Sequence, residues 1–275
     1  MARIDLPVSK LRARRRRRRA LLAGALVFVV LVLAAGAVWL AHAPFVRVVS
    51  VEVSGAQSVA SSTIEEYVRS QMAGDYLWLF PRDNIFLYPR RAIEAGLLAR
   101  YPALRSVDVH AADFRTVAVA AVERQPAALW CPTGATQEGC FYMDEDGVVY
   151  SPAPDFSSPV YVSYEGALAP SAQAGARQYL APADFQSLSA LAGALGQKEP
   201  DDPVRTVVVD DSRDVRVYFQ NDFVLIFNLK DDGGDIFERF TLALASDPFK
   251  GKSLGDFEYL DLRFGDKLYY KLKGQ

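Results

Sequence analysis

ALLAGALVFVVLVLAAGAVWLA, residues 20–41, decides the architecture of this chain of 275 residues. The stretch contains no charged side chain. As an α-helix, its 22 residues are about 33 Å long, which is enough to cross the hydrocarbon core of a bilayer. The sequence therefore predicts a transmembrane helix over residues 20–43 and an exported domain behind it.

A short and very basic tail precedes this stretch. Residues 1–19 carry nine Lys or Arg, six of them consecutive at 14–19, and one acidic residue. Arginines directly before a membrane span hold that end in the cytoplasm, where anionic lipid attracts them. We therefore expect a cytoplasmic N-terminus, lipid of the inner (cytoplasmic) membrane as a partner, and all later residues outside the cytoplasm. Trp39 suits the headgroup layer at the far end.

The charge of the remaining chain argues against nucleic acid as a partner. Removing the nine basic residues and one acidic residue of the tail from totals of 31 and 33 leaves 22 and 32, a formal charge of −10. A nucleic-acid-binding domain carries the opposite sign. The arginine run by itself is also typical of nucleic-acid or nuclear-targeting patches, but the apolar stretch behind it favours the membrane interpretation.

A cleavable signal peptide is the competing interpretation of residues 20–43. Ala41-His42-Ala43 has the small residues of a cleavage site. However, the apolar run exceeds the usual length of a signal-peptide core, which is roughly 7–15 residues. Pro44 would also place a rigid imide at the bond to be cleaved. We therefore favour an uncleaved anchor.

Residues 45–126 have the pattern of a small α+β domain. A strand is expected over Val46–Val53, followed by a helix with a capping box of Ser62 and Glu65, and a second helix from Pro89 to Tyr101. Two further strands are expected over 106–110 and 116–122, whereas residues 75–88 look irregular. The order predicts a three-stranded sheet with both helices on one face.

Residues 127–275 predict a β-rich second domain with one or two helices. Apolar alternation and turn residues indicate a hairpin over 141–150, a short strand within 155–164, and strands over 204–209, 215–219 and 224–229. Helical spacing of apolar residues indicates helices over 182–196 and 236–245. The chain closes with a hairpin of residues 259–264 and 267–272, turning at Gly265-Asp266.

No catalytic or metal-binding constellation is present in the sequence. The two histidines, His42 and His110, lack metal-ligand neighbours at a useful spacing, and no serine lies in a nucleophile-elbow motif. The acidic clusters at 144–146 and 231–235 lack the further ligands of a calcium loop and are interpreted as solvated turns. We expect a protein that is not an enzyme and that has no cofactor and no small-molecule substrate.

Cys131 and Cys140 are the only cysteines. Outside the cytoplasm disulfides persist, so we expect these two to be bonded. The bond would remove loop entropy worth about 2–3 kcal/mol on the chain-entropy model. Two free thiols are the alternative, and two isolated cysteines cannot complete a tetrahedral metal site.

Several short segments follow the predicted membrane span in a characteristic order. They are Val51-Glu52-Val53-Ser54-Gly55, Tyr101-Pro102 before Val107-Asp108-Val109, Val122–Trp130 (VERQPAALW), Asp144–Tyr150 (DEDGVVY) and Tyr259–Phe264 (YLDLRF). In this order, the segments resemble the FtsQ/DivIB family of cell-division proteins. The resemblance implies a POTRA domain over residues 45–126 and a β domain over 127–275. It also implies a non-catalytic scaffold at the division septum, which helps couple division-ring assembly to septal peptidoglycan synthesis.

The same resemblance implies a binding site for partner proteins at the C-terminal edge of the β domain. The partners would be membrane-anchored division proteins, similar to FtsB and FtsL, bound by strand addition. The residues at or beside this edge are Tyr259, Leu260, Leu262, Arg263, Phe264, Leu268, Tyr269 and Tyr270. Arg263 would pair with an acidic group of the partner, while a purely structural role, with the leucines in the core and the tyrosines covering it, stays open.

A second function class also remains open. An anchored accessory factor of secretion or envelope assembly can be built on a POTRA unit too. Proteins that chaperone outer-membrane strands usually carry several such units or a barrel, and this sequence shows one unit and no series of amphipathic ten-residue strands. The scaffold interpretation is therefore favoured.

Overall fold

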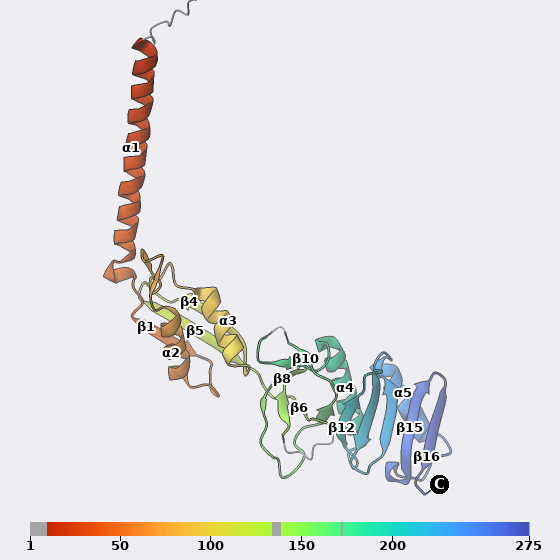
Figure 1. The fold of residues 1–275 in the computed structure, drawn as a ribbon. Coiled ribbons are helices and arrows are strands. Elements are labelled where there is room, and N and C mark those ends of the chain that lie inside the picture. The colour runs from red at the N-terminus through yellow and green to blue at the C-terminus, as the bar shows by residue number, and fades with distance from the viewer. Residues whose placement is uncertain (1–9, 134–138, 172, 275) are drawn as a thin grey trace, which may run out of the picture. The chain divides into compact units, whose positions relative to one another are not determined.

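The computed structural model describes residues 10–133, 139–171 and 173–274. The chain packs as two compact units (Figure 1). The first comprises the chain up to Gly55 together with Val59–Glu94 and Asp108–Ala120. The second comprises Ala56–Ser58, Ala95–Val107 and the chain from Ala121 onward. The fold is mixed α+β, and the expected domain limits 45–126 and 127–275 stay predictions.

Helix α1, Lys10–Ala41, contains the predicted apolar stretch. It is long and apolar enough to cross a membrane, and its apolar side chains between Leu21 and Leu33 are exposed. Its last turn belongs to the fold of the first unit. The side-chain amide of Asn84, which is buried, donates to the carbonyl oxygen of Ala41 over 2.9 Å. The helix therefore passes directly into folded structure.

The chain between α1 and the first strand differs from the prediction. A 3-10 turn, η1, covers Pro44–Val46, and the strand β1 is confined to Ser50–Ser54. The predicted start at Val46 is wrong because the intervening residues bond to another segment. The amide of Val48 donates to Asp83 O, and the amide of Ile85 donates to Val46 O. This exchange ties the segment after α1 to residues 83–85.

A three-stranded sheet follows, with the order β1-β5-β4 and β1 parallel to β5. Strand β4 is Leu104–Ala111 and β5 is Thr116–Glu123. The two helices are α2, Ser61–Gln71, and α3, Arg90–Arg100. Their apolar stripes, Ile64 with Val68 and Ile93 with Leu97, are buried, as expected of amphipathic helices.

Two local predictions for this part are wrong. The capping box of Ser62 and Glu65 does not form, because α2 begins two residues earlier than it requires, with Ala60 as its N-cap, and Glu65 pairs with Arg69 instead. Residues 75–88 are also not wholly irregular. They include a small hairpin of β2, Asp75–Tyr76, and β3, Phe80–Pro81, whose strands are too short for a periodic pattern.

The second unit contains a sheet of eleven strands with the order β10-β11-β8-β7-β6-β9-β12-β13-β14-β15-β16. The strands predicted over 204–209 and 267–272 are confirmed with these bounds. The short strands β6, β10 and β11 were not predicted. The bounds are β6 Ala128–Trp130, β7 Phe141–Met143, β8 Val148–Pro152, β9 Ser163–Glu165, β10 Ala169–Pro170, β11 Arg177–Gln178, β12 Val204–Val209, β13 Asp214–Phe219, β14 Val224–Asn228, β15 Phe257–Phe264 and β16 Lys267–Leu272.

Two helices share the buried core of this sheet (Figure 1). Helix α4, Pro182–Lys198, and helix α5, Gly233–Ala245, begin and end close to the predicted limits. The acidic run at 231–235 has a structural role that the sequence interpretation missed. The side chain of Asp232 accepts from the amides of Gly234 and Asp235 and so caps α5. A second 3-10 turn, η2, covers Leu254–Asp256.

Cys131 and Cys140 are joined by a disulfide with a Cα–Cα distance of 4.3 Å. Both are buried beside Leu129, and partly buried aromatic residues that include Tyr142 and Phe156 pack against them. The bridge connects the end of β6 with the start of β7, two antiparallel neighbours. It therefore closes the loop between adjacent strands and serves the local structure.

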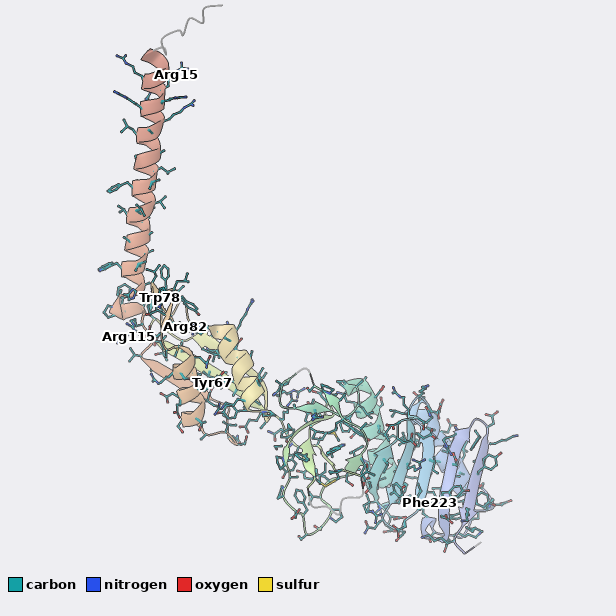
Figure 2. The ribbon with its side chains drawn as sticks, in the orientation of Figure 1. Arg15, Tyr67, Trp78, Arg82, Arg115 and Phe223 are labelled. Carbon is teal, nitrogen blue, oxygen red and sulfur yellow. A yellow bond between two sulfur atoms is a disulfide. The ribbon has the colours of Figure 1, made fainter. Side chains whose placement is uncertain are left out.

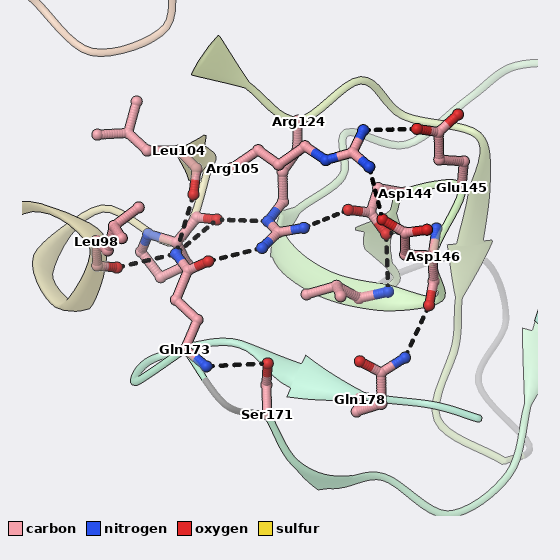
Figure 3. Close-up of polar contacts among 12 residues, drawn as sticks. Leu98, Leu104, Arg105, Arg124, Asp144, Glu145, Asp146, Ser171, Gln173 and Gln178 are labelled. Carbon is pink, nitrogen blue, oxygen red and sulfur yellow. Dashed lines mark hydrogen bonds and ion pairs between the residues drawn. The ribbon is translucent and has the colours of Figure 1, made fainter. Parts of the chain in front are cut away.

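A buried ion pair within the second unit organises the segments around the β7–β8 turn (Figure 3). The guanidinium of Arg124 pairs with the carboxylate of Asp144, and both side chains are almost fully buried. Arg124 also donates to Gln173 Oε1 over 2.6 Å and to Pro102 O over 3.2 Å. The second carboxylate oxygen of Asp144 accepts from the amide of Val148 over 2.9 Å.

Gln173 extends this network to α3 and β4. Its side-chain amide donates to Leu98 O over 2.9 Å and to Leu104 O over 3.0 Å (Figure 3). Arg124 and Gln173 together therefore satisfy carbonyl groups at the C-terminal end of α3 and the start of β4. Such groups are costly to leave unpaired when buried.

The acidic cluster at 144–146 forms the predicted hairpin turn, in which Glu145 is exposed, but the expectation that the whole turn is solvated is wrong for Asp144. Asp144 is buried on Arg124, while Glu145 and Asp146 both pair with Arg105, Asp146 over 2.8 Å. The partners lie 20 to 41 residues away in the sequence, which is why the local pattern could not indicate them. Within the described residues, no group of three or more potential ligands is placed to hold a metal ion.

We expect Arg124→Ala to lower the free energy of unfolding by about 3–5 kcal/mol, because the substitution leaves the carboxylate of Asp144 buried without its charged partner. Arg105→Ala is the matched control. Its side chain is 45% exposed, so its loss should cost no more than about 1 kcal/mol. Urea unfolding of the full chain in detergent measures both. Equal effects of the two variants would contradict the central role given to Arg124.

Candidate partner-binding edge

Strand β16 forms one end of the eleven-stranded sheet. It pairs with β15 on one side, and no other strand of the described residues pairs with its second side. The opposite end of the sheet is β10, which has two residues, one of them Pro170. Proline has no amide hydrogen and makes a poor template for a further strand. With six residues and no proline, β16 is the more suitable edge for strand addition.

The turn that produces this edge is set by Gly265. Its φ of 61° lies in the left-handed region, which glycine enters without a steric penalty. Gly265 and Asp266 connect Phe264 directly to its partner Lys267, so the two strands are joined by a two-residue turn. Arg239 of α5 supports the turn, because its guanidinium donates to Leu262 O over 2.8 Å and to Gly265 O.

Leu260 and Leu262 point into the core beneath the edge. Both side chains are buried in the cluster that contains Phe240 of α5. They are therefore core residues, the structural role that the sequence had left open, and their side chains are not accessible to a partner. The two buried leucines hold β15 in a fixed position next to the edge strand.

Arg263 is engaged within the chain. Its guanidinium donates to the carboxylate of Asp261 over 2.6 Å and to that of Asp214, on β13, over 2.5 Å. These hydrogen bonds raise the pKa of Arg263 above its ordinary value, and the bond to Asp261 has the larger effect. An acidic partner group would have to compete with two carboxylates. The pairing of Arg263 with a partner stays a prediction.

One side of β16 continues the apolar surface of the core. Leu260 lies opposite Tyr270 in the register, so Tyr270 and, by alternation, Leu268 face the same side as the core leucines. The ring of Tyr270 contacts those of Phe257 and Phe249, with centroids 5.9 and 5.5 Å away. Leu268 and Tyr270 remain 38% and 40% exposed. Incoming side chains on this side would meet apolar and aromatic groups.

The other side of β16 is aromatic and basic. Tyr269 lies opposite Asp261 and its ring packs edge-to-face on Phe264, with centroids 5.0 Å apart. Lys271 lies opposite Tyr259, which is partly exposed, and pairs with Glu258 over 2.6 Å. This hydrogen bond to Glu258 raises the pKa of Lys271. Lysine on a free edge opposes pairing with another copy of the same basic strand.

The eight residues predicted at this edge thus divide into three groups. Phe264, Leu268, Tyr269 and Tyr270 are exposed, Tyr259 is partly exposed, and Leu260, Leu262 and the ion pairs of Arg263 are structural. Sequence reasoning missed Leu242 of α5, which is 62% exposed although its helix packs in the same core. It also missed Lys267 and Lys271. Their positions near the two ends of the last predicted strand could have indicated an edge strand.

Comparison with protein-family models gives no match for this chain. Comparison with curated protein sequences also gives none.

We expect the Arg263 cluster to make stability depend on pH. Burial opposes the charged form of Asp261, but the hydrogen bonds from Arg263 outweigh it, so the pKa of Asp261 is lowered in the folded protein. Its stabilising effect is full well above the unfolded pKa of about 3.9 and is lost as the pH falls through the folded value. Arg263→Gln should therefore reduce stability by about 1–3 kcal/mol at pH 7 and flatten the loss in acid.

Urea unfolding of the full chain between neutral and acidic pH measures this slope. Arg205→Gln is the matched control, since Arg205 pairs with the exposed Asp222 over 3.2 Å. This control should follow the wild-type profile. An Arg263→Gln profile parallel to the wild type would show that Asp261 does not depend on Arg263.

Proposed function

We propose that this protein is a non-catalytic, single-span membrane scaffold of bacterial cell division. In this proposal β16 binds an extended segment of another membrane-anchored division protein, similar to FtsB or FtsL, outside the cytoplasm. The observation that carries the proposal is the free, proline-free edge of the large sheet, with four exposed apolar or aromatic side chains at its two strands.

The N-terminal part of the chain supports the membrane side of this proposal. The helix α1 is long and apolar enough to span a bilayer, and Arg14 to Arg19 lie at its N-terminal end. With the positive residues in the cytoplasm, the chain that follows α1 would lie outside it. The strand and helix order of residues 50–123 is compatible with the proposed POTRA domain, and the limits 45–126 and 127–275 stay proposals.

The edge favours a partner segment of a particular kind. An added strand places alternate side chains on the two sides of the sheet. On one side they meet Leu268 and Tyr270, which favours apolar residues. On the other side they meet Tyr269 and the lysines, which favours aromatic or acidic residues. We infer that the partner segment alternates between these two types.

A substitution at the edge tests the binding site. We expect Leu268→Asp to abolish co-purification of the small single-span division proteins, because an incoming apolar side chain would meet a carboxylate. Val160→Asp is the matched control, as Val160 is also exposed and lies in the same unit away from β16. Both variants should unfold like the wild type. Co-purification with Leu268→Asp at wild-type levels would exclude this edge as the binding site.

Localisation tests the division role independently. A fluorescent protein fused to the N-terminal tail should concentrate at midcell in dividing cells, and the Leu268→Asp variant should remain in the membrane. A uniform envelope signal through the whole division cycle would overturn the division role. The weight would then move to an anchored accessory factor in secretion or envelope assembly.

A further inference from the structure

The first unit exposes large apolar side chains around the end of α1. We call Phe45, Leu77, Trp78, Phe86 and Phe114 the juxtamembrane patch. Each is more than half exposed, with Trp78 at 94% and Leu77 at 84%. Figure 2 shows Trp78 beside the end of α1, and β3 of its hairpin contacts that helix. So many exposed large apolar groups in one region mark an interaction surface.

The patch is connected to α1 by a shared hollow of about 370 Å³. Its wall is formed by Ala37 and Leu40 of α1 together with Phe45, Phe86 and Phe114 of the patch. Asn84 is the single polar residue in this wall, and its amide is already bonded to Ala41 O. The rings of Phe86 and Phe114 lie edge-to-face, with centroids 6.4 Å apart. The hollow is thus an apolar surface open at the side of the helix.

The position along α1 fixes the depth of these residues. A hydrocarbon core of about 30 Å takes about 20 helical residues, so a span that begins at Ala20 reaches its far boundary near Leu40. Ala37 then lies inside the core and Ala41 at its border. Phe86 and Phe114 share a wall with Ala37 and Leu40, and therefore reach the same level.

The tip of the hairpin of β2 and β3 has a backbone conformation that its residue types disfavour. Leu77 and Trp78 have φ values of 50° and 58°. This left-handed region costs a side chain with a Cβ about 1–2 kcal/mol, and glycine or asparagine usually occupies it. Both side chains are exposed, so packing within the unit does not offset this cost. An apolar surrounding that removes Leu77 and Trp78 from water would offset this conformational cost.

We propose that the juxtamembrane patch inserts into the outer interfacial layer of the bilayer that α1 crosses, giving the first unit a second lipid contact. This inference rests on the proposed membrane span of α1. A tryptophan and several phenylalanines suit the layer between headgroups and acyl chains. Two arginines lie near the patch and would bind lipid phosphate groups (Figure 2). They are Arg115, which is exposed, and Arg82, whose guanidinium lies 5.0 Å from the ring of Tyr76.

The second contact limits the motion of the first unit. A single helix allows a domain to tilt and to rotate about the helix axis. The hydrogen bond from Asn84 to Ala41 connects the folded part of the unit to the last turn of α1, and the patch, inserted on one side, opposes tilting toward the other side. The unit would therefore present a constant face away from the membrane.

Fluorescence depth measurements on the full chain test the proposal. The protein has three tryptophans, so Trp39→Phe with Trp130→Phe leaves Trp78 as the single reporter, and Trp78→Phe with Trp130→Phe leaves Trp39. Both proteins are placed in phosphatidylglycerol/phosphatidylethanolamine vesicles with lipids brominated at known depths. We expect brominated lipid to quench both reporters, and aqueous iodide to quench Trp78 weakly. Adding Phe86→Asp and Phe114→Asp should restore quenching of Trp78 by iodide.

The two reporters separate this inference from the membrane anchor. Quenching of Trp39 by brominated lipid, with Trp78 quenched by iodide alone, would overturn the insertion and leave the anchor intact. Absence of lipid quenching at both positions would overturn the anchor and with it the insertion. A Trp78 reporter that is inaccessible to both quenchers would show that protein covers the patch, which also contradicts the proposal.

Discussion

The buried pair of Arg124 and Asp144 is the interaction on which the second unit depends. Its charges are shielded from water, so each requires the other and the further hydrogen bonds that complete the network. Arg124 supplies donors to Gln173 and Pro102, and Asp144 accepts the amides that shape the β7–β8 turn. Segments from residues 98 to 173 are thereby held in one arrangement. The neighbouring Glu123 accepts hydrogen bonds from the amides of Gln57 and Ser58. Both Glu123 and Arg124 therefore have structural partners.

The far end of the sheet depends on a second set of charges. Arg263 bridges Asp261 and Asp214, and Arg239 satisfies the carbonyls at the β15–β16 turn. These contacts fix β15 firmly, while β16 beyond it has one side that no strand of the described residues pairs with. A rigid strand with a free edge binds an extended segment without first paying to order itself. The proposed function thus uses side chains that support the edge as much as those that are exposed on it.

In the first unit, a long apolar helix continues directly into folded structure. Asn84 bonds to the last turn of α1, and the exchange of amides between residues 46–48 and 83–85 closes the junction. The orientation of the exposed aromatic residues therefore follows from the orientation of α1. In the proposed topology, a bilayer that sets the position of α1 would also set the position of the surface around it.

By itself, the sequence determined the features that depend on local composition and periodicity. The apolar helix, the amphipathic helices α2 to α5 and most strands of five or more residues were predicted, because each carries its own pattern of side chains. The disulfide was predicted as well, since Cys131 and Cys140 are the only cysteines of the chain. The tertiary structure alone decided what lies across the fold. It placed Leu260 and Leu262 in the core, joined Arg124 to Asp144, gave Arg263 two internal carboxylates and gathered Phe45, Trp78 and Phe114 around α1. The reason is physical: burial and charge pairing depend on which residues meet in space, and no local pattern encodes partners that lie tens of residues apart.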